Sequence, residues 1–316
     1  MKVLYVGDFI KGNGPSTVDI CVRDSIEKST KRDDVDFLQS TTKPSFSIFK
    51  KIFEIDSVHV SGVSFLGMLL IVFARLCGKK STMTMHGSLV IESQFKKVSL
   101  YRRIFEYIQQ KLANQIMPVS SLLAEKAKIN KKCTVIPNGK NENNINIIST
   151  DKNNNLITLI GGGRREKRHL DICEVIQKIN NENGFNIQVN LFGEKGVDSN
   201  KIKTFDFVKD FGFCDKDTVF YSLARSRIFI QYSEFEPFSL AVADAINYGC
   251  YIITSNLVGI NEFITESDSY IIVNNKLQLE TAIISQYNNR ERVIIDNNLL
   301  TWEQVTTKYI KCWETL

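Results

Sequence analysis

One stretch, residues 228–256, constrains the fold more than any other part of the chain. It reads IFIQYSEFEPFSLAVADAINYGCYIITSN. Residues 228–231 are typical of a short buried strand, and Pro237 suits the first position of a helix that continues to Tyr248. Gly249 ends this helix, and residues 251–254 are again rich in β-branched side chains. This strand-helix-strand unit predicts a parallel sheet, in which ligands bind at the carboxyl ends of the strands.

Two carboxylates follow the first strand of this unit. Glu236 and Asp244 are separated by eight positions, which corresponds to roughly 12 Å of rise along a helix. One carboxylate at the start of the helix and one about two turns later could contact two hydroxyl-bearing parts of one extended ligand. Two solvated surface carboxylates are the alternative interpretation of this spacing. The strand-turn-helix context favours the ligand site.

The same stretch resembles the signature of retaining GT-B glycosyltransferases, especially glycosyltransferase family 4. That pattern runs Glu-Gly-Phe-Gly-Leu, a second Glu eight residues after the first, and then Gly-x-Pro-Val-Ile. The chain has Glu236-Pro237-Phe238-Ser239-Leu240, Asp244 and Gly249-Cys250-Tyr251-Ile252. Asp therefore replaces the second Glu, and Pro and Ser replace two glycines. The resemblance implies that Glu236 faces the donor sugar and Asp244 the nucleotide ribose. It also places Phe238, Ser239 and Leu240 in the donor site.

Strand and helix signals alternate along the rest of the chain without hairpin signals, which predicts parallel sheets covered on both faces. A length of 316 residues suits two domains, and the Asn-rich segment 140–155 is the expected linker. We therefore predict an α/β GT-B fold, with two Rossmann-like domains facing an interdomain cleft. Residues 1–145 would form the acceptor domain and residues 146–300 the nucleotide-sugar donor domain. A C-terminal helix, 301–316, would cross back to the first domain.

The first of two glycine-containing loops follows the expected strand 2–7. It contains Gly12 and Gly14 and leads into a helix from about Ser16. The N-terminus of a helix offers backbone N–H groups and a positive dipole end to an anion. A plain flexible turn is the alternative, while the resemblance implies that Gly12 and Gly14 approach the donor phosphates or the acceptor.

The second loop, residues 161–168, reads GGGRREKR and follows the expected strand 156–160. Three glycines allow the backbone to approach a diphosphate, and the basic side chains neutralise charge on a departing nucleotide. A basic surface turn is the alternative. The loop resembles the family pattern Gly-Arg-Leu, three variable residues and Lys-Gly, with Lys167 at the lysine and Gly162 where the family has Arg. Gly163, Arg164 and Lys167 are thus expected to bind the donor.

Three histidines occur in the chain, and His86 lies just after the expected strand 81–85. A lone histidine is usually structural, but the resemblance implies that His86 contacts the transferred sugar near the acceptor. His59 is interpreted as structural, and His169 is expected to face water or a neighbouring side chain. The predicted catalytic set is therefore Glu236, His86 and Lys167.

Other parts of the sequence bear on metal ions, nucleic acids, disulfides and membrane spans. Asp215 and Asp217 are spaced like the metal-binding Asp-x-Asp of GT-A transferases. Acidic residues also favour the first turn of a helix, so we interpret this pair as a helix cap. We therefore predict no metal and no cofactor beyond the donor. A net charge of +5 does not indicate a nucleic-acid partner. Seven cysteines without a Cys-x-x-Cys pair predict reduced core thiols and a cytoplasmic location. The apolar run 65–77 is too short to span a bilayer and is expected to form a buried helix.

Residues 95–112, FKKVSLYRRIFEYIQQKL, form a basic amphipathic pattern. Such a helix either packs on its own sheet or rests on an anionic membrane, and both interpretations stay open. The function predicted from the resemblance is metal-independent, retaining hexosyl transfer from a nucleotide-diphosphate sugar to a glycan or lipid-linked acceptor. This would serve bacterial surface polysaccharide or lipopolysaccharide synthesis at the inner face of the membrane. Alternatives are a nucleotide-sugar 2-epimerase of similar fold, or a catalytically silent partner subunit.

Overall fold

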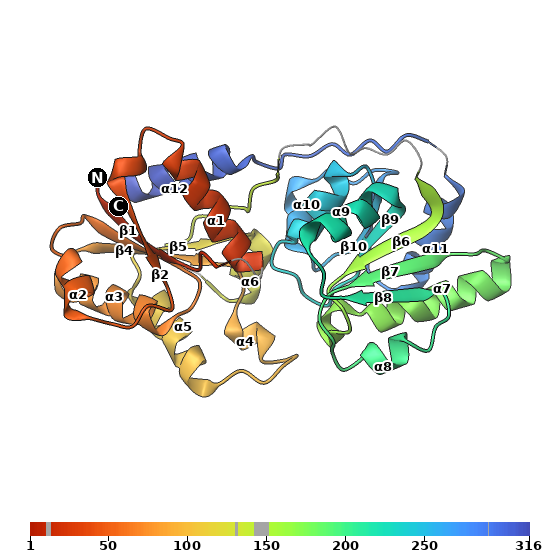
Figure 1. Ribbon diagram of the computed structural model, residues 1–316, viewed down its shortest axis with the longest axis horizontal. Helices are drawn as coiled ribbons and strands as arrows, with labels where there is room; N and C mark the ends of the chain where they lie inside the picture. Colours follow the sequence, from red (N-terminus) through yellow and green to blue (C-terminus); the bar gives the residue numbers. More distant parts are fainter. Residues whose placement is uncertain (11–13, 130–131, 142–151, 290) are drawn as a thin grey trace. The chain divides into compact units, whose positions relative to one another are not determined.

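The computed structural model describes residues 1–10, 14–129, 132–141, 152–289 and 291–316. The chain divides into two compact units, each of which is described by itself (Figure 1). Unit 1 comprises Met1–Lys140 and Leu300–Leu316, and unit 2 comprises Asn141–Leu299. The central part of the expected linker, residues 142–151, lies outside the described residues.

Unit 1 is built on a parallel sheet of five strands. These are β1 (Val3–Gly7), β2 (Val35–Gln39), β3 (Ser57–Ser61), β4 (Lys80–Met85) and β5 (Gln115–Pro118), in the spatial order β2-β1-β3-β4-β5. The chain places β2 on one side of β1 and β3 on the other. The carboxyl ends of β1 and β3 therefore form the switch point at which parallel sheets of this kind bind ligands.

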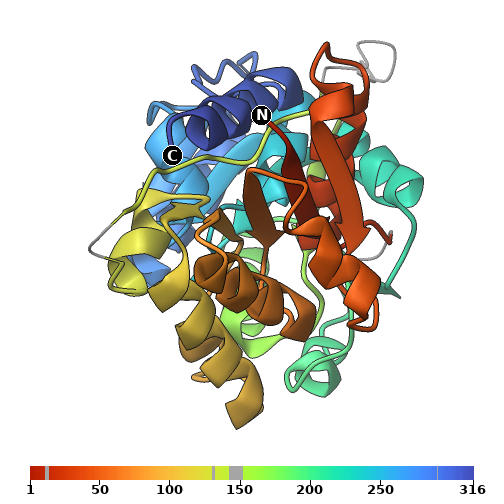
Figure 2. The same cartoon turned by 90° about the vertical axis from the view of Figure 1, so that its left-hand side faces the viewer.

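The elements around this sheet are α1 (Gly14–Glu27), η1 (Arg32–Asp34), α2 (Phe46–Lys51), α3 (Phe65–Leu76), α4 (Leu89–Glu92), α5 (Leu100–Leu112), α6 (Ser121–Lys126) and α12 (Trp302–Glu314). Helix α12 packs beside α1 (Figure 1) and begins with a capping box formed by Thr301 and Gln304. Its Tyr309 and Trp313 are buried. Helices α3 and α5 lie side by side on one face of the unit (Figure 2). The apolar core lies between the sheet and α2 and α3.

Unit 2 has a parallel sheet of six strands. They are β6 (Asn153–Ile160), β7 (Gln188–Phe192), β8 (Val208–Gly212), β9 (Ser226–Gln231), β10 (Tyr251–Ser255) and β11 (Tyr270–Val273), in the order β11-β10-β9-β6-β7-β8. From β6 the chain first adds β7 and β8 on one side, and then adds β9 on the other side. The switch point of this sheet therefore lies between β6 and β9.

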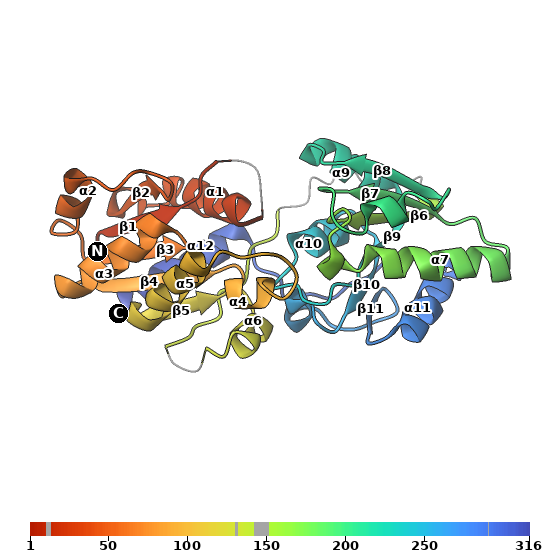
Figure 3. The same ribbon diagram turned by 90° about the horizontal axis from the view of Figure 1, so that it is seen from below.

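The elements of unit 2 outside the sheet are η3 (Arg165–Lys167), α7 (His169–Asn183), α8 (Ser199–Ile202), α9 (Lys216–Arg225), α10 (Leu240–Asn247), η4 (Gly259–Phe263) and α11 (Lys276–Asn288). Helices α7 and α11 pack side by side (Figure 3). The central strands are fully buried and rich in apolar side chains, as expected for a parallel sheet covered on both faces. Ile176, Ile230 and Ile253 belong to this core.

The predicted fold class is confirmed as two α/β Rossmann-like domains with parallel sheets. Several local predictions are corrected. Helix α10 begins at Leu240 rather than at Pro237, and α5 begins at Leu100, so the basic residues 96–97 precede it. All seven cysteines are free thiols, but only Cys173 and Cys250 are buried. No helix in the described ranges has the length and apolar character needed to cross a membrane.

Candidate functional site

The β6/β9 switch point of unit 2 brings together two of the predicted catalytic residues. Lys167 ends the η3 turn that follows β6, and Glu236 lies in the turn after β9. The Lys167 Nζ and a Glu236 carboxylate oxygen form an ion pair between residues 69 positions apart. The two side chains are only 10% and 19% exposed, so water screens the pair less than it screens a surface ion pair. The sheet therefore places a shielded cation and an anion at its ligand-binding edge.

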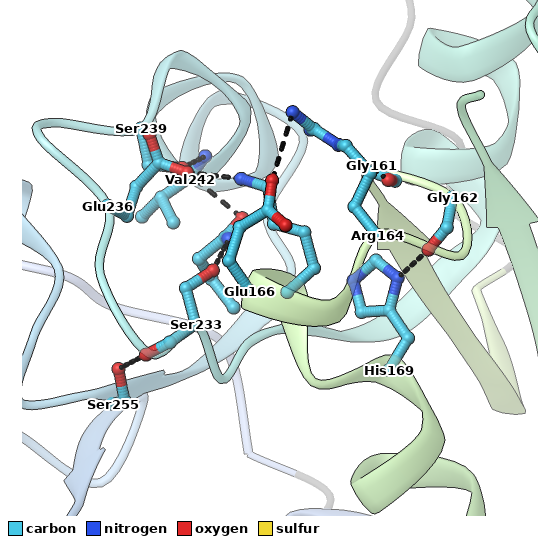
Figure 4. A network of polar contacts seen from close by, with 12 residues as sticks. Gly161, Gly162, Arg164, Glu166, His169, Ser233, Glu236, Ser239, Val242 and Ser255 are labelled. Atoms are coloured by element: carbon cyan, nitrogen blue, oxygen red, sulfur yellow. Dashed lines mark hydrogen bonds and ion pairs between the residues drawn. The ribbon is translucent and has the colours of Figure 1, made fainter. Parts of the chain in front are cut away.

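Backbone hydrogen bonds fix the turn that carries Glu236. The Glu236 N–H donates to Leu257 O at 2.9 Å, and Gly259 N–H donates back to Glu236 O at 2.9 Å. The Glu234 N–H donates to Glu166 O at 2.8 Å, which joins this turn to η3. A further hydrogen bond of 2.6 Å runs from the Ser255 hydroxyl to the Ser233 carbonyl (Figure 4). The position of Glu236 is thus set by the segments that follow β6 and β10.

The glycine loop after β6 differs from the prediction. The N–H groups of Gly161 and Gly162 donate to Phe192 O at 2.7 and 2.8 Å, and the Gly163 N–H donates to Glu194 O at 3.2 Å. These amides are therefore occupied by the backbone after β7, which corrects the expectation that they would face a diphosphate. A Cβ on Gly162 would lie 1.9 Å from Glu194 O. The glycines are required because two loops pack together here.

Arg164 and His169 hold the same loop from two sides (Figure 4). The Arg164 guanidinium donates to Gly161 O at 3.0 Å and lies 3.6 Å from a Glu166 carboxylate oxygen, with 45% of the side chain exposed. His169 is buried and its Nδ1 donates to Gly162 O at 2.6 Å. Burial lowers the pKa of His169 to about 3. The expectation that His169 faces water or a side chain is therefore wrong, because its partner is the loop backbone.

The entrance to α10 contains three of the expected donor-binding residues. Ser239 has a positive φ of 92° and its hydroxyl accepts from the Val242 N–H at 3.3 Å, which caps the helix (Figure 4). The Phe238 side chain is buried against Phe263, with 5.9 Å between the ring centroids. Leu240 is half-buried. The Phe238 ring therefore supports the turn from inside instead of facing a ligand.

Asp244 has different neighbours from Glu236. It is half-buried, and it accepts a hydrogen bond of 3.2 Å from the Asn141 side chain. Burial raises the pKa of Asp244 to about 6, although Lys216 and Asn141 act in the opposite direction. The structure brings Glu236 together with Lys167, and it places Asp244 beside Asn141.

In unit 1, His86 follows β4 at the carboxyl edge of the sheet. Its Nε2 lies 2.8 Å from the Ser61 hydroxyl, and its Nδ1 is buried with no hydrogen-bond partner among the described residues. Burial lowers the pKa of His86 to about 4, so the imidazole is neutral at pH 7. Gly14 is an exposed residue at the start of α1, and a Cβ there would meet no other atom. Gly12 lies outside the described residues.

Sequence reasoning missed a buried carboxylate in unit 1. Asp19 on α1 is 1% exposed and accepts hydrogen bonds from the Tyr5 hydroxyl at 2.8 Å and the Asp8 N–H at 2.7 Å. Burial raises the pKa of Asp19 to about 6. Its position between Val18 and Val22, which face the core, is the signal that could have indicated a buried acid.

Two other predictions concern residues away from these sites. Asp215 accepts a hydrogen bond from the Thr218 N–H at 2.8 Å and caps α9, as expected from its place before a helix. His59 is buried in β3, where its ring contacts Thr82, Thr84 and Trp313 through hydrogen bonds. Its structural interpretation is therefore confirmed.

Comparisons with known proteins support a single family. The model of the family described as Glycosyl transferases group 1 matches residues 140–298, just over half of the chain. No curated protein sequence shows significant similarity.

Among solved structures, HepE of Anabaena, in complex with UDP and glucose, has a TM-score of 0.73 at 13% identity, with 100% of both chains covered. Sucrose-phosphate synthase of Thermosynechococcus elongatus has a TM-score of 0.69 at 14% identity, covering 100% of this chain and 99% of that one. The lipopolysaccharide outer core galactosyltransferase WaaB has a TM-score of 0.64 at 16% identity, covering 100% and 98%. These structures share the GT-B fold, and the family model shows that the chain belongs to the group 1 glycosyltransferases.

Proposed function

We propose that this protein transfers a hexosyl group, with retention and without a metal ion, from a nucleoside-diphosphate sugar to a glycan or lipid-linked acceptor. The observation that carries the proposal is the Lys167–Glu236 ion pair at the β6/β9 switch point. A shielded ammonium is suited to stabilise the charge that develops on a departing diphosphate. The neighbouring carboxylate is suited to accept hydrogen bonds from sugar hydroxyls.

In this proposal the N-terminus of α10, and not the glycine amides, binds the diphosphate. Helix α10 starts at Leu240, four residues after Glu236, and the N-terminus of a helix favours a phosphate. Arg164, which is about half exposed beside Glu166, adds a second cation near Lys167. The proposed donor site therefore combines Lys167, Arg164 and the first turn of α10 for the diphosphate, with Glu236 for the sugar and Asp244 for the ribose.

UDP-sugars are the first donors to test, because the HepE structure contains UDP and glucose. The parent protein is incubated with a panel of nucleotide sugars, and the products are analysed for free nucleotide and for the configuration of the sugar. Release of nucleotide with a retained anomeric configuration supports the proposal. An epimerised nucleotide sugar would identify a 2-epimerase, and the absence of turnover and donor binding would favour a silent subunit.

The ion pair is tested with Lys167→Met and Glu236→Gln, which preserve side-chain size. Each is expected to lower kcat by on the order of 100-fold, since both groups act most strongly in the transition state. The matched controls are Lys178→Met and Glu280→Gln, which break another ion pair of unit 2 with a Lys Nζ to Glu oxygen distance of 2.8 Å and a lysine that is 49% exposed. Unchanged kcat in the Lys167 and Glu236 variants would remove the pair from the active site.

Helix α5 supports peripheral contact with an anionic membrane. Its two buried side chains, Glu106 and Gln109, are both polar. Glu106 accepts a hydrogen bond from the Leu89 N–H at 3.1 Å, and Gln109 donates one to Gly62 O at 3.4 Å. Its exposed side chains include Leu100 (70%) and Ile104 (47%), and the cations Arg102 and Arg103 are exposed beside them. Exposed apolar side chains beside cations fit the interface of an anionic bilayer.

Basic residues border this apolar surface. Lys96, Lys97 and Arg103 line an open hollow of about 610 Å³ just before α5. We expect the protein to sediment with vesicles that contain phosphatidylglycerol, and less so at high salt. The double variant Leu100→Ser/Ile104→Ser should lose this binding, whereas Leu277→Ser, at a leucine of unit 2 that is 71% exposed, should retain it. Equal binding by all variants would show that α5 does not contact the membrane.

A further inference from the structure

Arg168 forms a further side-chain link between the two turns that carry the Lys167–Glu236 ion pair. Its Nε donates to an Asp171 carboxylate oxygen at 2.8 Å, and its Nη2 donates to the Tyr232 hydroxyl at 3.2 Å. The guanidinium also lies over the Tyr232 ring, 4.1 Å from the ring centroid. Tyr232 is 1% exposed and belongs to the apolar core of unit 2. The core therefore fixes the ring on which the guanidinium rests, and burial of one side of the guanidinium strengthens the contact.

The backbone of Arg168 is left-handed, which a side chain disfavours. Its φ of 54° and ψ of 32° lie in the region that glycine adopts most readily, and the family pattern has glycine after the lysine. The Arg168 carbonyl accepts a hydrogen bond of 3.2 Å from the Ile172 N–H, in the first turn of α7. A position that suits glycine therefore carries a side chain with contacts to Asp171 and to both the ring and the hydroxyl of Tyr232. These contacts offset the unfavourable backbone and give the side chain a role of its own.

Three neighbouring cross-links join the turn after β6 to the turn after β9. They are the backbone hydrogen bond of 2.8 Å from Glu234 N–H to Glu166 O, the Lys167–Glu236 ion pair and the Arg168–Tyr232 contact. A bound diphosphate would break the ion pair, because its oxygens compete with Glu236 for the Lys167 ammonium. The Arg168–Tyr232 contact uses neither of these two groups. It can therefore persist when the ion pair opens.

We infer that Arg168 is a positioning residue, which keeps the turn of Lys167 against the turn of Glu236 while a nucleoside diphosphate occupies the Lys167 ammonium. The role at a nucleoside diphosphate rests on the function proposed above. In the donor-free protein the ion pair and the Arg168–Tyr232 contact hold the turns together. In the donor-bound protein Arg168 is the side chain that continues to do so. A preorganised ammonium binds the diphosphate without first having to be ordered.

Hydrogen exchange of the Glu234 amide tests this link without any ligand. The amide donates to Glu166 O, so it exchanges with solvent when the two turns separate. Glu236→Gln opens the ion pair as a diphosphate would, and Arg168→Gln removes the guanidinium but keeps the left-handed side-chain position. Each single variant is expected to speed the exchange by less than about 10-fold, because the other link remains, and the double variant by about 100-fold or more. A double variant that exchanges no faster than the product of the two single effects would overturn the inference.

The matched control is Arg225→Gln, at another arginine of unit 2 that contacts a tyrosine. Arg225 lies 5.5 Å from the centroid of the Tyr221 ring and donates to the Tyr221 hydroxyl at 3.3 Å. Both residues are exposed on α9, and their contact joins two turns of one helix. Arg225→Gln should therefore leave the Glu234 exchange unchanged, with or without Glu236→Gln. Faster exchange in this control would show a general effect of a lost charge and would overturn the role of Arg168.

Calorimetric titration with UDP tests the role at the donor. Arg168→Gln is expected to raise the dissociation constant of UDP by about 10-fold. Combined with Lys167→Met, it should weaken UDP binding no further, because Arg168 acts through Lys167. An equal further loss in the Lys167→Met background would show that the Arg168 charge binds the nucleotide directly, which contradicts a positioning role. A parent protein that binds no nucleoside diphosphate would refute the proposed function, whereas the exchange of the Glu234 amide would still decide whether Arg168 holds the two turns.

Discussion

Ser239 adopts a backbone conformation that is strained for any residue with a side chain. Its φ of 92° and ψ of 89° lie outside the regions that L-residues normally occupy, and such a conformation costs about 1–3 kcal/mol. Glycine adopts positive φ without this cost. The family pattern has glycine at this position, whereas Ser239 also supplies a hydroxyl that caps α10 at the Val242 N–H. The backbone strain at Ser239 therefore lowers the stability of the fold, whereas its helix cap raises it.

Two substitutions separate these contributions. In Ser239→Gly, relief of about 1–3 kcal/mol of strain is partly offset by about 0.5–1 kcal/mol for the flexible unfolded chain and a few tenths for the cap. The expected net gain in the free energy of unfolding is about 1 kcal/mol. Ser239→Ala keeps the strain and loses the cap, so it should lose about 1 kcal/mol. The two variants should therefore differ by about 2 kcal/mol.

Urea unfolding measures this difference if the two units are followed separately. Both tryptophans, Trp302 and Trp313, belong to unit 1, so their fluorescence follows that unit. Circular dichroism follows both units, and the change should appear only in the transition that fluorescence does not report. If Ser239→Ala is at least as stable as Ser239→Gly, the positive φ carries no strain and the reasoning fails. A shift in the fluorescence transition would show that the effect is not confined to unit 2.

Three further predictions concern the glycine loop, Asp244 and metal dependence. Gly162→Ala should destabilise unit 2 by about 2–4 kcal/mol in urea unfolding, because the new Cβ would collide with Glu194 O. Gly184→Ala, with φ of +66° and open space around it, should cost only about 1 kcal/mol, and equal losses would contradict the packing argument. Asp244→Asn should weaken nucleotide binding by about 1.5–3 kcal/mol in calorimetry. The carboxylate is the binding form and its pKa is about 6, so the nucleotide affinity of the parent protein should decrease when the pH is lowered below about 6. An unaltered affinity in the Asn variant would leave Asp244 as a helix residue paired with Asn141. Transfer should persist in excess EDTA, and its loss with rescue by Mg²⁺ or Mn²⁺ would contradict the metal-free proposal.

Strands that are buried on both faces are the easiest to predict from the sequence, although the edge strands β5 and β8 were predicted as well. Every residue of β3, β9 and β10 is buried, and Val, Ile, Phe or Tyr side chains make up much of each strand, so a short window of sequence identifies them. Strand β2 lies at the edge of its sheet and is mostly half-buried, with charged and polar residues among its five positions. Strand β11, also at an edge, has only four residues. Neither β2 nor β11 was predicted, because an edge strand that meets solvent can carry a weaker hydrophobic pattern.

The glycine loop shows a second limit of sequence reasoning. Consecutive glycines indicate only that another group approaches the backbone closely. A ligand phosphate and a neighbouring loop both require this close approach, so the sequence does not distinguish them. The neighbour of Gly162 is Glu194, which follows a different strand. Which of the two explanations holds depends on the order of β6 and β7 in the sheet, and that order is not a local property of either segment.

The roles of Lys167 and Glu236 were predicted separately, one for the diphosphate and one for the sugar, and the structure joins them in one ion pair. This pairing matters for the proposed chemistry because a bound diphosphate would compete with Glu236 for the same ammonium. Binding would then release the carboxylate to accept hydrogen bonds from the sugar, so that Glu236 acts only when a donor is present. It also means that neither residue can be altered alone without leaving a shielded charge unpaired. The loss of activity in either single variant therefore includes a displacement of its partner, and the two losses should not add.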